Sequence, residues 1–293
     1  MQYHNIQWFP GHMAKALREI EERAKMVDVI IEILDARVVS SSRNPIVSKV
    51  APQKPRLIIL SKKDLADSDR TKEWIEHFKN QGHMAIALNI NKDDLQQIIN
   101  KLKIVLKDKI ERDKRRGLKN SIIRALVVGI PNVGKSSFIN KIAKRKATIV
   151  GNKPGVTKAQ QWIKVRDDFE LLDTPGVLWP KFEDKEVGAK LALVGTMPID
   201  IMPLHELSSL LFNYLFAHHK DYLLKRYNVA MEGEEMNEQV MEDLIIKIGQ
   251  NRGMLKAKGE VDIEKTEELV LREFKNGILG TFSLDIVGEQ ING

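Results

Sequence analysis

The stretch Gly129-Ile130-Pro131-Asn132-Val133-Gly134-Lys135-Ser136 decides the fold. A short run rich in β-branched residues, 122–128, precedes it and predicts a buried strand, while 138–143 continues with the apolar spacing of a helix. A glycine-rich turn between a strand and a helix surrounds phosphate groups with backbone N–H donors. The sequence therefore predicts a nucleotide-binding α/β fold, in which Lys135 reaches the β- and γ-phosphates and the Ser136 hydroxyl binds Mg²⁺.

The remaining phosphate and Mg²⁺ contacts are expected from residues around this loop. Val133, Gly134 and Ser137 are further candidates for phosphate binding. A second apolar stretch, 169–172, ends in Asp173, which predicts a strand-end carboxylate that holds Mg²⁺ through water. Gly176 then offers a backbone N–H to the γ-phosphate. Thr157 would complete the Mg²⁺ shell, with Thr148 as the alternative.

Guanine recognition is predicted from the tetrapeptide Ser61-Lys62-Lys63-Asp64, which follows a plausible strand over 56–60. A carboxylate at Asp64 accepts from the N1–H and N2–H groups of guanine, and adenine has no such donor pair, so GTP is preferred over ATP. The stem of Lys62 can cover the base. Serine at position 61 is shorter than the usual asparagine. We expect this difference to affect the affinity for the nucleotide more than the choice of base. Asn89 and Ile90, after the apolar run 84–88, fall where a backbone donor to the base is expected.

The order of these motifs is permuted, because the guanine tetrapeptide precedes the phosphate loop and Asp173-Thr174-Pro175-Gly176 follows it. With the N-terminal Trp8-Phe9-Pro10-Gly11-His12-Met13, the strand 27–37 and the segment 252–256, the chain resembles circularly permuted GTPases of the ribosome-assembly class, closest to the bacterial ribosome biogenesis GTPase A family. The resemblance implies hydrolysis of GTP to GDP and phosphate. It also implies a role in late maturation of the large (50S) ribosomal subunit, with precursor particles, rRNA and ribosomal proteins as partners.

The residue that orients the attacking water is a separate question, because Val177 stands where many small GTPases place a glutamine. The resemblance implies that a histidine of the N-terminal motif, His12 here, enters the site. We count His12 with Lys135 and Thr157 as catalytic candidates. The alternative is that His12 caps or packs the helix that Pro10-Gly11 begins.

Asn132 suggests a further cation site. An amide oxygen in this part of a phosphate loop can bind K⁺ beside the β- and γ-phosphates, so that the ion supplies the positive charge of an arginine finger. The alternative is an asparagine that only holds a tight turn after Pro131.

Bulk properties agree with an intracellular phosphate-rich partner. The chain has 293 residues, no cysteine, a formal charge of +7 and a pI near 9.3, and it lacks a signal-peptide or membrane-spanning apolar block. We expect a cytoplasmic monomer that binds neither DNA nor membrane. The expected fold is a permuted P-loop GTPase domain over 1–201, with a mostly parallel sheet and helices on both faces. A small all-helical RNA- or ribosome-binding domain over 202–293 follows, with helices near 205–227, 238–250 and 263–275.

Cationic segments are candidates for RNA contact. The linker 107–119 carries seven Lys and Arg residues, although its first half, where acidic side chains offset them, is more typical of a solvated helix. Better candidates are Arg115-Arg116 and 144–146. In the helical domain the candidates are Arg252, Lys256, Lys258, Arg272 and Lys275.

Two other functions stay open. A guanine-nucleotide-dependent RNA-binding scaffold with negligible hydrolysis is favoured by Ser61 and Val177. A tRNA-modifying or signalling GTPase is disfavoured, because no modification-cofactor motif or lipid anchor is visible.

Overall fold

The computed structural model describes residue 18 and residues 20–45, 51–118, 121–144, 162–174, 185–199, 202–231 and 236–288. The chain forms two compact units, which are described separately below. Residues 1–184 and 283–293 make up a sheet unit, and residues 185–282 make up a helical unit. The division at 184/185 lies earlier than the boundary expected at 201/202, because an additional apolar helix begins the helical unit.

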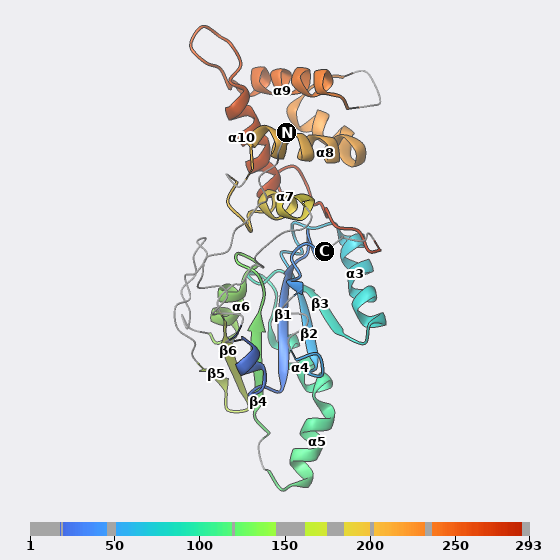
Figure 1. Cartoon of the computed structure of the whole chain (residues 1–293), viewed down its shortest axis with the longest axis vertical. Helices are drawn as coiled ribbons and strands as arrows, with labels where there is room; N and C mark the ends of the chain where they lie inside the picture. Colours follow the sequence, from blue (N-terminus) through green and yellow to red (C-terminus); the bar gives the residue numbers. More distant parts are fainter. Residues whose placement is uncertain are drawn as a thin grey trace. The chain divides into compact units, whose positions relative to one another are not determined.

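The sheet unit is built on a six-stranded sheet in the order β3-β2-β1-β4-β6-β5 (Figure 1). All neighbouring strands are parallel except the pair β5 and β6. The strands are β1 (Val29–Asp35), β2 (Arg56–Ser61), β3 (Met84–Leu88), β4 (Ile123–Val128), β5 (Trp162–Arg166) and β6 (Phe169–Asp173). This confirms the mostly parallel sheet that the sequence predicts, while β5 was not anticipated.

The order of the strands places the ligand crevice. Within the sheet, β2 and β3 lie on one side of β1, and β4 and β6 lie on the other side of it. Such a switch point between adjacent parallel strands leaves a crevice at their carboxyl ends. Every residue of β1 and β2 is buried, as expected for parallel strands covered on both faces.

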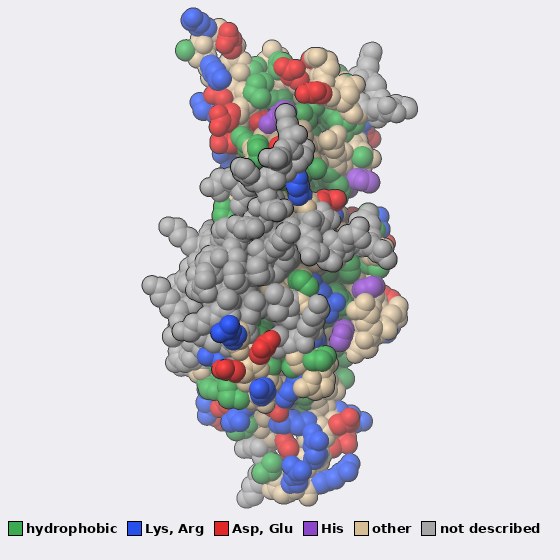
Figure 2. Space-filling model, viewed as in Figure 1, with side chains coloured by type: hydrophobic (Ala, Val, Ile, Leu, Met, Phe, Trp, Pro, Cys, Tyr) green, Lys and Arg blue, Asp and Glu red, His purple; other side chains and the backbone are tan. Residues whose placement is uncertain are grey.

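Four helices of the sheet unit have defined bounds. They are α3 (Ser68–Asn80), α4 (Gln96–Val105), α5 (Lys107–Arg115) and α6 (Lys135–Ile142). Helix α5 buries none of its residues, which confirms that the first half of the linker 107–119 is a solvated helix. Figure 2 shows Lys and Arg side chains gathered over this helix, with acidic side chains among them.

The helical unit contains α7 (Lys185–Leu193), α8 (Leu204–Tyr227), α9 (Glu238–Arg252) and α10 (Ile263–Lys275). The last three lie where the apolar spacing predicts them. Helix α8 is interrupted at His219, whose backbone is not helical (φ −143°, ψ 32°). Asn237 caps α9 and Asp262 caps α10, since each side chain accepts from a backbone N–H of its first turn. Among the described residues, no helix has the length and apolar character needed to cross a bilayer.

After α10 the chain returns to the sheet unit. We call residues 283–288 the docked segment, because they pack on the loops that follow β1 and β2. Val287 lies against an apolar cluster that includes Leu34, Leu60 and Trp74. The sheet unit is therefore made of two stretches of chain that are distant in sequence, and the sequence did not predict this return.

Candidate functional site

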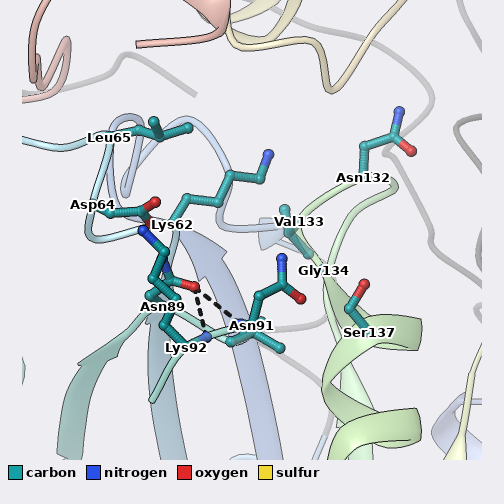
Figure 3. Close-up of a pocket in the computed structure, with 11 residues that line it drawn as sticks. Lys62, Asp64, Leu65, Asn89, Asn91, Lys92, Asn132, Val133, Gly134 and Ser137 are labelled. Carbon is teal, nitrogen blue, oxygen red and sulfur yellow. Dashed lines mark hydrogen bonds between the residues drawn. The ribbon is translucent and has the colours of Figure 1, made fainter.

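A pocket of about 370 Å³ opens at the carboxyl ends of the central strands (Figure 3). Three groups of predicted site residues meet there, although they lie apart in sequence. The pocket is lined by Lys62, Asp64, Leu65, Asn89, Ile90, Asn91, Lys92, Asn132, Val133, Gly134 and Ser137. The fold thus brings the guanine tetrapeptide, the 89–92 loop and the phosphate loop to one place.

Two glycines allow the path of the phosphate loop. Gly129 has φ +151°, and a Cβ at this position would lie 2.5 Å from the Ile33 carbonyl oxygen, so any side chain would collide with β1. Gly134 has φ +101° and is the N-cap of α6. The amino terminus of α6 therefore faces the pocket, and its first-turn N–H groups and helix dipole favour an anion there.

Lys135 begins α6 and is nearly buried, with 8% of its surface exposed. Its ammonium donates to the Ile130 carbonyl oxygen at 3.0 Å, so the side chain folds back over its own loop. Burial lowers the pKa of Lys135 to about 8, against the opposing effect of the Asp173 carboxylate. Phosphate oxygens beside this ammonium would restore the charge that burial disfavours.

Asp173 ends β6, beside Val127 of the parallel strand β4. The following Thr174 hydroxyl donates to the Val127 carbonyl oxygen at 2.7 Å and fixes this strand end. The Asp173 side chain is 2% exposed, and within the described residues neither carboxylate oxygen has a hydrogen-bond partner of good geometry. Burial raises the pKa of Asp173 to about 6, although the charge of Lys135 and the Thr174 N–H oppose the shift. A buried carboxylate without a well-aligned donor fits a Mg²⁺ shell, which would supply the missing charge.

Ser61 connects the two halves of the site. Its hydroxyl is fully buried and lies 2.9 Å from the Leu34 carbonyl oxygen and 2.7 Å from that of Val133. Because a hydroxyl carries one proton, it donates to one of these carbonyls at a time. The shorter side chain at this position thus still reaches the phosphate loop.

Asp35 is a site residue that the sequence motifs do not predict. Its carboxylate, at the end of β1, pairs with the Lys62 ammonium at 2.8 Å and with the Arg37 guanidinium at 2.8 Å. Although its full burial acts in the other direction, the charges of Arg37 and Lys62 hold the pKa of Asp35 well below its usual range. Asp35 therefore fixes Lys62, near the start of the guanine tetrapeptide. A charged residue that ends a buried strand was the signal that could have revealed it.

Asn89 organises the loop opposite Asp64. Its side-chain oxygen accepts from the N–H groups of Asn91 and Lys92 at 3.0 and 3.1 Å (Figure 3). Its own N–H donates to the Asp93 carboxylate, which also pairs with the Lys63 ammonium at 2.6 Å. The hydrogen bond from Lys63 is the main reason that the pKa of Asp93 is lowered. Asp93 thus connects the loop to the tetrapeptide, and the sequence motifs do not predict this role either.

Packing also joins this loop to the phosphate loop. A Cβ on Gly134 would lie 2.9 Å from the terminal methyl of Ile90, so a larger residue would push the two apart. His12, Thr157, Gly176 and Val177 lie outside the described residues.

The strand order, the glycine-lined loop at the start of α6 and the pocket that it shares with Asp64 define a P-loop nucleotide-binding protein with its motifs in permuted order. A family model described as "50S ribosome-binding GTPase" matches residues 124–223, which include the phosphate loop but not the upstream tetrapeptide. Because full-length relatives that bear this name match nearly the whole chain, the chain belongs to the ribosome biogenesis GTPase A family. It is therefore a GTPase, as the motifs predict.

The assignment to this family rests on relatives that match over their full length. The chain is 46% identical over 290 residues to a ribosome biogenesis GTPase A of Bacillus cereus, covering 98% of this chain and 96% of the relative. It is 45% identical over 282 residues to that of Priestia megaterium, covering 96% of both. Among solved structures it is similar to GNP-bound YlqF from T. maritima, with a TM-score of 0.65, 26% identity and coverage of 93% of this chain and 98% of the other.

Proposed function

We propose that this GTPase acts in the late assembly of the large ribosomal subunit, as a cytoplasmic monomer that binds precursor particles and hydrolyses GTP to GDP and phosphate. The observation that carries the proposal is the shared pocket, in which the guanine tetrapeptide and the phosphate loop meet although their order in the chain is permuted. The names of the full-length relatives support ribosome assembly as the process. The helical unit and the basic charge support an RNA-rich partner.

Nucleotide binding in this pocket follows from the positions of its groups. The Asp64 carboxylate accepts from guanine while the Lys62 stem lies along the base, and the N–H groups at the start of α6 receive the phosphates. Asn89 shapes the loop that faces the base, and we assign base contact to the backbone around Ile90. Lys135 turns from the Ile130 carbonyl to the β- and γ-phosphates.

Mg²⁺ would be held by Ser136, Thr157 and, through water, Asp173, and it would neutralise charge that develops on the phosphates. The orphaned carboxylate of Asp173 supports this assignment. Gly176 would donate to the γ-phosphate from the adjoining segment.

K⁺ is proposed at Asn132, which has the unusual φ of +58° and lines the pocket beside the phosphate loop. Turnover should then be faster in K⁺ than in Na⁺ at equal ionic strength, and equal rates in the two salts would reject this site.

His12 is proposed to orient or polarise the attacking water, because valine at position 177 has no group that can do so. A His12→Ala variant should bind GTP with unchanged affinity and lose particle-stimulated turnover. Full stimulated turnover in that variant would leave His12 with the packing role only.

RNA contacts are proposed within each unit: Arg115 and Arg116 at the exposed end of α5 in the sheet unit, and the turn that carries Lys256 and Lys258 in the helical unit. Arg252 is a weaker candidate than the sequence suggested, because its guanidinium donates to the Arg226 carbonyl oxygen and lies over the Tyr227 ring. We further propose that the GTP form binds the particle and that hydrolysis permits release. Equal particle affinity with GDP and with a non-hydrolysable GTP analogue would contradict this cycle.

The test of the main proposal is GTP hydrolysis by the purified protein in K⁺ buffer, alone and with large ribosomal subunits or their precursors. Strong stimulation by the particles supports it. Intact GTP binding without hydrolysis, even with particles, would instead support the scaffold function.

A further inference from the structure

The docked segment contacts the loops that follow β1 and β2, and the loop after β2 bears Lys62 and Asp64. The Asp285 carboxylate is 2% exposed and accepts from the Ser41 N–H at 2.7 Å and from the Ser41 hydroxyl at 2.9 Å. The Leu284 N–H donates to the Arg37 carbonyl oxygen at 2.7 Å. Asp285 therefore holds the loop that follows β1, and Asp35, the last residue of that strand, pairs with Lys62.

The same segment also holds the loop after β2. The Ser283 hydroxyl accepts from the Asp67 N–H at 3.2 Å, three residues after Asp64. The Trp74 indole N–H, from α3 just beyond that loop, donates to the Asp285 carbonyl oxygen at 3.3 Å. These contacts are buried or partly buried, which makes them stronger and costly to lose.

We infer that the docked segment is a third element of the guanine-binding half, and that Asp285 and Ser283 are positioning residues for base recognition. They do not line the pocket, and they act through the loop that carries Lys62 and Asp64 and through the loop after β1. Without these contacts both loops gain freedom, and Asp64 loses its fixed direction toward the base. The inference rests on the proposed guanine-nucleotide binding, and it adds a selectivity determinant more than two hundred residues away in sequence.

The test compares GDP with inosine diphosphate, which has the same phosphates but lacks the 2-amino group that donates to Asp64. Dissociation constants are measured by titration of the full chain without ribosomal particles. In Asp285→Ala we expect GDP affinity to fall about tenfold, and affinity for inosine diphosphate to fall much less, as one hydrogen bond to a charged group predicts. Asp285→Asn keeps an acceptor and should recover part of the preference. Ser283→Ala is a milder change, and it should shift the ratio of the two dissociation constants in the same direction.

The matched control is Asp262→Ala, which removes a buried capping aspartate from α10 in the helical unit. It should lower stability without changing the ratio of the two affinities. Amide hydrogen exchange at Ser41 and Asp67 reports whether the docked segment has been released. Faster exchange there with an unchanged affinity ratio in Asp285→Ala would overturn the inference. A wild-type chain that binds both nucleotides equally would overturn the guanine site and this inference together, whereas failed stimulation by particles would count only against the role in assembly.

Discussion

The Ser61 hydroxyl lies 2.7 Å from the Val133 carbonyl oxygen, and this contact joins the guanine tetrapeptide to the phosphate loop. The two residues are 72 positions apart in the chain. The contact shows how a serine substitutes for the longer asparagine that is usual at this position. The fully buried hydroxyl spans the gap because β2 and the phosphate loop approach closely here.

Ser61→Ala should therefore weaken both recognition of the base and binding of the phosphates. It removes the buried hydroxyl that donates to the Leu34 or the Val133 carbonyl oxygen, which costs about 1–3 kcal/mol. We expect a lower free energy of unfolding in urea and about tenfold weaker GDP binding for a loss near the low end of that range. GDP affinity equal to that of the wild-type chain would show that the loop keeps its position without this contact.

Asp35→Asn should destabilise the sheet unit, because it leaves the Arg37 and Lys62 cations without their shared buried partner. Removing one partner from a buried ion pair costs about 3–5 kcal/mol, and the part exposure of Lys62 favours the lower value. Because the folded pKa of Asp35 is depressed, its stabilisation is present above the ordinary carboxyl pKa and is lost as the pH falls toward the folded value. The difference between wild type and variant in urea should thus be full at pH 7 and shrink progressively below pH 4.

Asp173→Asn should have the opposite effect on the nucleotide-free protein. Burial raises the pKa from 3.8 to about 6, so the protonated carboxyl favours folding; this contribution is full below the unfolded pKa and is lost as the pH rises through about 6. At pH 7 the neutral amide should stabilise the fold by up to about 3 kcal/mol, at about 1.4 kcal/mol per pKa unit. The gain is reduced because Lys135 loses an opposite charge.

The same variant should lose the Mg²⁺ dependence of nucleotide binding. The measurements are thermal unfolding without ligand and GDP titration with and without Mg²⁺. A variant that is less stable than wild type at pH 7 would show that Asp173 has a stabilising partner in the ligand-free chain.

Gly129→Ala should damage the fold more than a glycine substitution at a helix end. The new Cβ would need to occupy a point 2.5 Å from the Ile33 carbonyl oxygen, in addition to the strain of φ +151°. We expect a loss of at least about 2 kcal/mol in urea unfolding. The control is Gly253→Ala, where φ is +66° and nothing lies within 4 Å, so only about 1 kcal/mol of backbone strain is expected. Equal losses in the two variants would remove the steric argument.

The sequence predicted the parts of the fold that local pattern determines. The parallel strands are short, largely apolar runs, and the three long helices of the helical unit have regular apolar spacing, so their positions were predicted closely. Strand β5 was not predicted, because its burial is mixed and it pairs antiparallel to β6 with an irregular register. Helix α7 was not predicted, because its small apolar residues do not form a clear apolar face in the sequence.

Residues that act through distant partners could not be predicted in the same way. Asp93 is an ordinary acidic residue in the sequence, and only the fold places the Lys63 ammonium beside it. Asp35 is marked as a charged end of a buried strand, but only the fold places Lys62 beside it. Ser283 and Asp285 lie in a short irregular stretch after the last helix, where no periodicity indicates burial. For them the information lies in pairings across the chain.

The return of residues 283–288 to the sheet unit also has a consequence for biosynthesis. Ser41 and Asp67 are made early, whereas the groups that they contact are 244 and 216 residues later in the chain. Closing such contacts is slow in folding, because the intervening chain must first be brought together. During translation the sheet unit therefore emerges with part of its packing surface uncovered, and it acquires its final contacts only after the whole helical unit has been synthesised.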